Sequence, residues 1–98
     1  IMKDLKVQNL KHNGRQVPNQ IEIFYEDNNK YYKIFQSYNS MIIKWENSKI
    51  IEVGKDWDYS KTTGKYRNLL TRKNKKEFEK MLKEEFTFNE ETQTYIRK

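Results

Sequence analysis

Alternation of apolar and polar positions is clearest at residues 20–26. Every second position there is apolar, namely Ile21, Ile23 and Tyr25, while Glu22 and Phe24 lie between them. A period of two in a segment rich in β-branched and aromatic residues predicts a half-buried strand. The four residues that follow, Asp-Asn-Asn-Lys, favour a turn because Asn and Asp tolerate a left-handed backbone. Residues 31–37 then return as the second strand of a hairpin.

Two more short strands follow, at residues 41–46 and 49–53, each preceded by a polar turn. Four short strands joined by tight turns predict an antiparallel meander. Gly54 ends this sheet. The first 19 residues show neither period over a useful length, so they predict a short strand or an irregular arm.

The second half of the chain changes to a helical period. Ser60 or Thr63 is expected to cap a helix that ends near Lys73. Its apolar face would carry Tyr66, Leu69 and Leu70. Residues 92–96 could add a short strand or form a tail.

A second helix is expected from Asn74 to about Glu85. Asn74 with Glu77 three positions later is typical of a capping box. The apolar positions of this helix repeat at helical spacing and predict its buried face: Phe78, Met81, Leu82 and Phe86. The predicted fold is therefore one α+β domain over residues 1–98, with a four-stranded antiparallel meander followed by two α-helices packed on one face.

Composition excludes several kinds of site. The chain has no cysteine and one histidine, so a thiolate metal site, a disulfide framework and a histidine-rich metal centre are ruled out. No metal or cofactor is expected. The apolar fraction of 35% is low, but aromatic residues make up 14% of the chain and bury large areas each. No membrane-spanning run and no signal peptide are visible, which favours a cytoplasmic protein.

Positive charge is concentrated in residues 61–83. The chain carries a net charge of +6, whereas this segment alone has nine Lys or Arg and two Glu, giving 9 − 2 = +7. The basic residues are Lys61, Lys65, Arg67, Arg72, Lys73, Lys75, Lys76, Lys80 and Lys83. Such a segment can bind nucleic acid, meet an acidic protein surface, or simply form a solvated helix surface.

Residues 56–66 join the two halves and hold most of the candidate chemistry. Asp56 and Asp58 could bind a hard cation or act as an acid–base pair. The simpler interpretation is that they cap turns and pair with nearby cations, namely Lys55, Lys61 or Lys65. A phosphate loop is not indicated, because the required glycine and Gly-Lys-Ser/Thr ending are missing. The amides of Thr62, Thr63 and Gly64 could still form a weak anion site at the start of a helix.

The aromatic residues allow two interpretations. They could stack on unpaired bases, or they could form the core of a small domain that is short of Leu and Val. We expect Phe35, Trp57 and Tyr66 in the core, while Tyr38 and Tyr59 lie beside turns and are expected at the surface. His12, in a polar stretch, is expected to be a surface residue.

Three motifs resemble those of a known group of proteins. They are Phe35-Gln36-Ser37-Tyr38, Trp57-Asp58-Tyr59-Ser60 and Thr62-Thr63-Gly64-Lys65-Tyr66. Over roughly residues 20–70 the chain resembles small uncharacterised proteins of phages, plasmids and integrated elements in low-GC Gram-positive bacteria. The resemblance implies an accessory protein of a mobile element, of a kind whose genes lie among anti-CRISPR genes. It brings no catalytic residues.

The sequence thus predicts a non-enzymatic protein that binds and inhibits a host nucleic-acid-processing complex, such as an RNA-guided nuclease. The partner would be a host protein or ribonucleoprotein, and the oligomeric state is left open. The expected contact residues are Tyr38, Asp58, Tyr59, Lys61, Lys65 and Arg67. The alternative is a small DNA- or RNA-binding protein that uses the basic residues of 61–83.

Overall fold

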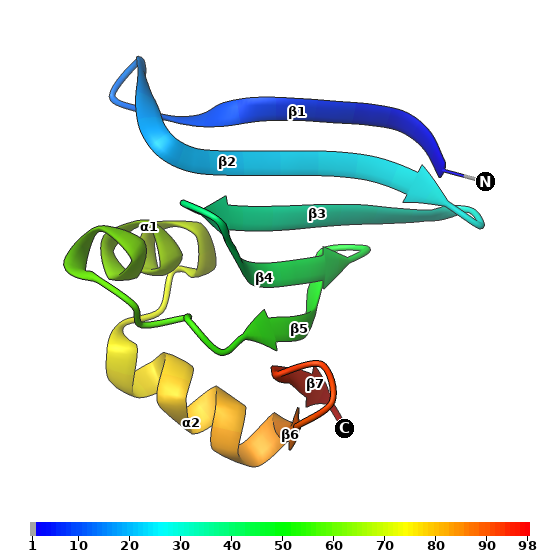
Figure 1. Cartoon of the computed structure of the whole chain (residues 1–98), viewed down its shortest axis with the longest axis vertical. Coiled ribbons are helices and arrows are strands. Elements are labelled where there is room, and N and C mark those ends of the chain that lie inside the picture. Colours follow the sequence, from blue (N-terminus) through cyan, green and yellow to red (C-terminus); the bar gives the residue numbers. More distant parts are fainter. Residues whose placement is uncertain (1) are drawn as a thin grey trace.

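The computed structural model describes residues 2–98 and contains one seven-stranded antiparallel sheet with two helices (Figure 1). The strand order is β1-β2-β3-β4-β5-β7-β6. The elements in chain order are β1 (Met2–His12), β2 (Arg15–Asp27), β3 (Lys30–Ser37), β4 (Ser40–Glu46), β5 (Lys49–Gly54), α1 (Lys61–Thr71), α2 (Lys75–Glu85), β6 (Phe86–Asn89) and β7 (Thr94–Arg97). The prediction of a four-stranded sheet is therefore wrong. The four predicted strands correspond to β2–β5, and β1, β7 and β6 extend the sheet to seven strands.

The N-terminal arm expected at residues 1–19 is instead a hairpin within residues 2–98. Strand β1 pairs along β2, and Asn13 and Gly14 form the turn with φ of 52° and 76°. Asn-Gly is a strong hairpin signal because both positions accept positive φ. The alternation of apolar and polar residues in this hairpin was hidden because the register of β1 against β2 shifts between Lys3 and Lys6 and again between Asn9 and Lys11. Each slip shifts the side-chain pattern from one face to the other. Residue 1 lies outside the described residues.

The C-terminal segment is also a hairpin. Strand β7 confirms the strand considered for residues 92–96, and it pairs with both β5 and β6. The strand β6 was missed because Phe86 fits the helical spacing of α2, although the chain leaves the helix at Glu85. The side chain of Phe86 is nevertheless buried as predicted.

Both predicted helices are present. Ser60 caps α1, and Asn74 caps α2 with the reciprocal bonds to Glu77 that define a capping box. Helix α1 ends at Thr71, before a left-handed Arg72, which is earlier than expected. Leu69 is exposed, contrary to prediction, because α1 buries a different set of residues: Thr63, Gly64, Tyr66 and Arg67.

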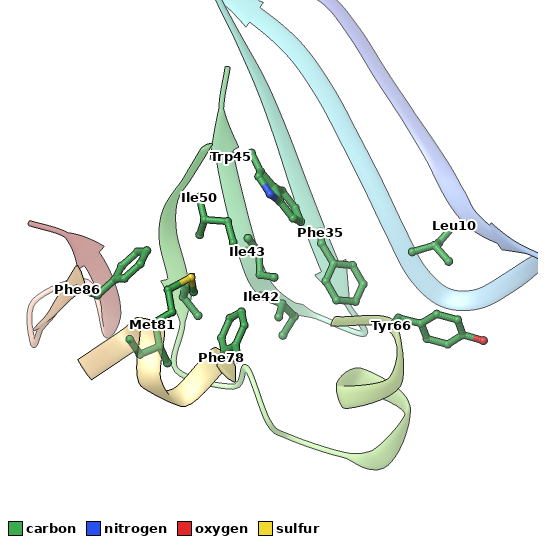
Figure 2. Close-up of a cluster of buried hydrophobic side chains, with 12 residues drawn as sticks. Leu10, Phe35, Ile42, Ile43, Trp45, Ile50, Tyr66, Phe78, Met81 and Phe86 are labelled. Atoms are coloured by element: carbon green, nitrogen blue, oxygen red, sulfur yellow. The ribbon is translucent and has the colours of Figure 1, made fainter. Parts of the chain in front are cut away.

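The core lies between the helices and one face of the sheet (Figure 2). Phe35, Ile43 and Val53 occupy neighbouring positions on β3, β4 and β5 and are fully buried. The buried residues of α2 pack onto them, while Tyr66 of α1 lies toward Leu10 of β1 (Figure 2). Phe35 and Tyr66 are core residues as predicted, and Trp57 is partly buried against the same cluster. Neither helix is long and apolar enough to span a membrane in residues 2–98.

Candidate binding surface

A hollow of about 480 Å³ opens between the β3–β4 turn and the start of α1. The turn and the 55–60 segment approach each other here because Ser40 donates a hydrogen bond to Asp56 across 2.8 Å. The hollow is lined by Ser37, Tyr38, Asn39, Ser40, Ile42, Tyr59, Ser60 and Thr63. It therefore combines the Phe-Gln-Ser-Tyr and Trp-Asp-Tyr-Ser motifs, which lie about 20 positions apart in the sequence.

Two exposed tyrosines flank this hollow. Tyr38 is 43% exposed and Tyr59 is 71% exposed, as predicted, and their rings meet edge to face with centroids 6.5 Å apart. We refer to these two residues as the tyrosine pair. Large exposed aromatic side chains in contact with each other present a ready apolar surface to a partner.

The backbone holds the tyrosine pair in place. Tyr38 adopts a left-handed conformation with φ of 55°, which is unfavourable for a bulky residue. Its amide donates to the carbonyl of Asn19 at 2.7 Å, and the side chain of Gln36 donates to its carbonyl at 2.9 Å. The amide of Tyr59 donates to the carbonyl of Asp56 at 3.0 Å. The unfavourable conformation is thus maintained by neighbouring strands.

Hydroxyl groups line the bottom of the hollow and are bonded to one another. Ser37 and Thr63 share a buried hydrogen bond of 2.8 Å between their hydroxyl oxygens. Ser60 accepts the amide of Thr63 at 3.1 Å, and its carbonyl accepts the amide of Gly64 at 2.9 Å. Two of the three amides considered for an anion site are therefore already bonded within the chain, which weakens that interpretation.

Asp56 and Asp58 do not act as a pair. Asp56 is bonded to Ser40, whereas Asp58 forms ion pairs with Arg67 at 3.1 Å and Lys75 at 2.7 Å. The expected partners among Lys55, Lys61 and Lys65 are wrong, because the folding of the helices brings Arg67 and Lys75 closer. No cluster of three or more metal-ligating side chains occurs among the described residues.

Arg67 lies inside the protein instead of at the contact surface. The residue is 1% exposed, and its guanidinium lies over the rings of Trp57 and Phe78, 5.1 and 5.3 Å from their centroids. It donates to the carbonyl of Trp57 at 2.8 Å and to Asp58. Arg67 and Asp58 therefore join the 55–60 segment to α1 and α2 and support the tyrosine pair from behind.

The ion pairs stabilise the charged form of Asp58. The hydrogen bond from Lys75, opposed by partial burial and assisted by Arg67, lowers the pKa of Asp58 below its usual value of 3.8. The same contact raises the pKa of Lys75 above 10.5. Arg67 and Lys75, two of the nine basic residues predicted as a nucleic-acid-binding region, therefore form ion pairs with Asp58 within the fold.

The other basic residues face solvent. Lys73 is partly exposed, and the remaining six are exposed: Lys61, Lys65, Arg72, Lys76, Lys80 and Lys83. Among residues 2–98 none of these seven side chains forms an ion pair. Lys61 directly follows Ser60 at the hollow, and Lys65 lies one helical turn later on the same face of α1. The ammonium of Lys65 lies over the ring of Tyr66 at 5.2 Å from its centroid.

Sequence reasoning missed the supporting contacts around this surface. Asn19, which accepts the amide of Tyr38, lies on β2, and only the folded register brings it to the β3–β4 turn. Gln36 lies two positions before Tyr38, but nothing in the sequence shows that its side chain turns to the carbonyl of Tyr38. Gln20 is fully buried, and neither polar atom of its side chain has a partner among the described residues. The sequence did not indicate that Gln20 is buried. The alternation of Ile21, Ile23 and Tyr25 indicated that their face of the strand is buried, and Gln20 lies on the opposite face.

The sequence model of a family of unknown function, DUF8033, matches residues 5–89. This match covers most of the sheet and both helices, so the chain belongs to that family. No curated protein and no solved structure shows significant similarity to the chain.

Proposed function

We propose that this member of the DUF8033 family is a non-enzymatic binding protein whose contact surface is the tyrosine pair with Lys61 and Lys65. The observation that carries the proposal is the fixed contact between two exposed tyrosine rings above a hollow. Tyrosine is enriched among the residues that dominate binding energy at protein interfaces. A side chain that is already ordered loses less conformational entropy when a partner binds.

The partner we propose is a host nucleic-acid-processing complex, such as an RNA-guided nuclease, in the cytoplasm of a bacterium that carries a mobile element. Two features support this choice. One is the sequence resemblance to mobile-element proteins. The other is the exposed lysines at the start of α1, Lys61 and Lys65, which would be attracted to acidic side chains such as the carboxylates that hold metal ions in a nuclease site.

The protein would inhibit by covering that working surface. Asp58 and Arg67, first expected at the contact, are given a supporting role because they bind each other and Arg67 is buried. Tyr38, Tyr59, Lys61 and Lys65 remain as the proposed contact residues.

The test is affinity capture from bacterial lysate, run with and without nuclease treatment. We expect a protein partner that remains after the nuclease, and much less of it with Tyr59→Ala. Tyr31→Ala is the matched control, because Tyr31 is 67% exposed but lies outside the hollow. Capture that depends on intact nucleic acid, or equal capture by Tyr59→Ala, would contradict the proposal.

A second candidate is direct binding to nucleic acid through the helices. It is favoured by one observation, the set of exposed basic side chains on α1 and α2 without ion-pair partners in residues 2–98. Binding to phosphates releases counterions, so affinity should fall steeply with salt, with a log–log slope of about −0.7 per phosphate contacted on a single strand. The variant Lys76→Glu/Lys80→Glu/Lys83→Glu should abolish binding, and a flat salt response would exclude this candidate.

A further inference from the structure

The two faces of the sheet differ in what covers them. One row of directly paired residues crosses all seven strands and includes the buried Phe35, Ile43 and Val53: Gln8, Glu22, Phe35, Ile43, Val53, Tyr95 and Phe88. The adjacent row is Val7, Ile23, Ile34, Lys44, Glu52, Ile96 and Thr87. Successive side chains of a strand point to opposite faces, so the second row lies on the face away from the helices. We call it the open face.

The open face is unusually apolar for a surface without a covering layer. Val7 is 59% exposed, and Ile23, Ile34 and Ile96 are partly exposed. Tyr25 and Tyr32 continue the surface with stacked rings 4.9 Å apart. None of these residues belongs to the core cluster or packs against it. An antiparallel sheet normally places polar residues on a face that meets water, so this face is suited to a partner.

Charge on the open face is balanced, in contrast to the rest of the protein. Lys44 and Glu52 are cross-strand neighbours in the middle of the row. Glu46 forms an ion pair with Lys30 at 3.6 Å and accepts the hydroxyl of Tyr32 at 3.1 Å. The excess positive charge of the chain lies in residues 61–83, on and between the helices. Nucleic acid or a strongly acidic protein would therefore be drawn to the helices, and the open face suits a surface with equal numbers of both charges.

We propose that the open face binds the open face of a second copy of this chain. A twofold axis that runs between β4 and β5, along the strands, brings Lys44 of each copy opposite Glu52 of the other. The same axis brings Ile34 opposite Ile96 and Ile23 opposite Thr87 of the second copy. The row is thus complementary to itself in charge and, at Ile34 and Ile96, in apolar contact, as a symmetric dimer requires.

The dimensions agree with a stable dimer. The axis superposes six strands, β2 to β6 in the order of the sheet, and leaves β1 outside; six strands about 4.8 Å apart and about 20 Å long give a face of roughly 600 Å² in projection. A standard interface buries about 800 Å² of accessible surface on each partner, which is of the same order. The two sheets would stack about 10 Å apart as a sandwich. The tyrosine pair and the basic helices of both copies would remain accessible in this dimer. Dimerisation and the proposed partner binding would use different surfaces, so the dimer proposal does not rest on the proposed function.

Sedimentation equilibrium of the whole chain tests the proposal directly. We expect a monomer–dimer equilibrium with a dissociation constant in the micromolar range or below, and at least a hundredfold weaker association for Ile34→Asp. Circular dichroism and a thermal melt check that this variant is folded. Tyr38→Ala, at the end of the sheet beside α1, should dimerise like the wild type. A wild-type chain that stays monomeric at millimolar concentration would overturn the proposal. If Ile34→Asp then weakened the capture of another protein, the open face would bind that protein and not a second copy.

A charge-exchange experiment tests the position of the axis. Lys44→Glu alone leaves acidic side chains at both positions 44 and 52, and Glu52→Lys alone leaves basic side chains at both. Each variant then places like charges opposite each other, so each should self-associate weakly. Their mixture should form heterodimers, because both contacts across the axis then join opposite charges.

The control for this experiment is a mixture of Lys80→Glu and Glu84→Lys, whose positions are exposed on α2. These two variants carry the same net charges as the first pair, but both keep the open face unchanged. Each should dimerise like the wild type, and their mixture should show no preference for heterodimers over homodimers. Absence of a heterodimer preference in the first mixture would overturn the proposed axis.

Discussion

At the scale of single residues, Arg67 is the main link between the turn that carries Tyr59 and the two helices. Its buried guanidinium bonds to Asp58 and to the carbonyl of Trp57 and lies over two aromatic rings. Arg67→Ala removes a fully buried side chain and leaves a cavity, whereas Asp58 keeps its ion pair with Lys75. Truncation of a large buried side chain costs about 2–5 kcal/mol, so we expect Arg67→Ala to lower the free energy of unfolding by about 3 kcal/mol in urea titrations. A loss below about 0.5 kcal/mol, typical of a surface site, would contradict this role.

Asp58 makes the stability of the protein depend on pH. Its pKa is lowered in the folded state, so its contribution is present above the unfolded value of 3.8 and is lost as pH falls toward the folded value. We expect the stability difference between wild type and Asp58→Asn to be largest above about pH 5 and to shrink in more acidic solution. Urea titrations at several pH values measure it. A difference that stays constant from about pH 6 to about pH 2 would contradict the assignment, and Glu84→Gln serves as an exposed control.

Two glycines are expected to respond oppositely to alanine. A Cβ at Gly54 would lie 1.9 Å from the carbonyl oxygen of Met41, so the backbone would have to move. A Cβ at Gly64 would meet only ordinary contacts of 3.6 Å or more, within a helix. Gly54→Ala should therefore lower the thermal midpoint, while Gly64→Ala should raise stability by up to about 1 kcal/mol. Similar changes in stability for the two variants would contradict the close approach of Gly54 to the carbonyl of Met41.

At the level of helices and strands, local signals predicted both helices and strands β2–β5, whereas the pairing of the outer strands of the sheet was not predicted. The capping box of α2 was predictable because Asn74 and Glu77 are three residues apart and bond to each other. The β1–β2 hairpin was missed because two slips in pairing hide its alternation. In β2 the apolar positions Ile21, Ile23 and Tyr25 correctly indicated a strand. They face away from the helices, however, and a sequence cannot say which face of a sheet the helices will cover.

The same contrast applies to the candidate surface. Exposure of Tyr38 and Tyr59 was predictable, since each lies beside a turn. Their contact with each other was not, because it depends on the bond between Ser40 and Asp56, which joins two loops. Burial of Arg67 was also hidden: a basic residue among exposed lysines carries no local sign that aromatic rings will surround it.

The cap of α2 can be tested separately from its packing. Asn74→Ala removes the acceptor for the amide of Glu77, now at 2.8 Å, and should cost about 1 kcal/mol. Asn74→Ser keeps an acceptor and should retain most of the stability. Urea titrations of both variants give the comparison. Equal losses for Ala and Ser would mean that the capping bond contributes little and that α2 is held by its buried face alone.

At the scale of the whole molecule, the structure separates three surfaces. The open face is apolar and balanced in charge, the helices carry the free positive charge, and the tyrosine pair lies at the end of the sheet beside α1. Arg67 and Asp58 connect the helices to the segment that carries Tyr59. A protein built in this way can dimerise through one surface and still present two copies of the contact surface to a partner.

The most direct test of the proposed function is the affinity of the captured partner for the wild type, Tyr59→Ala and Tyr31→Ala, measured by calorimetry without nucleic acid. We expect Tyr59→Ala to bind at least tenfold more weakly, as for a residue that dominates an interface, with an unchanged thermal midpoint. Tyr31→Ala should bind like the wild type. Equal affinity of all three proteins would contradict the claim that the tyrosine pair is the contact surface.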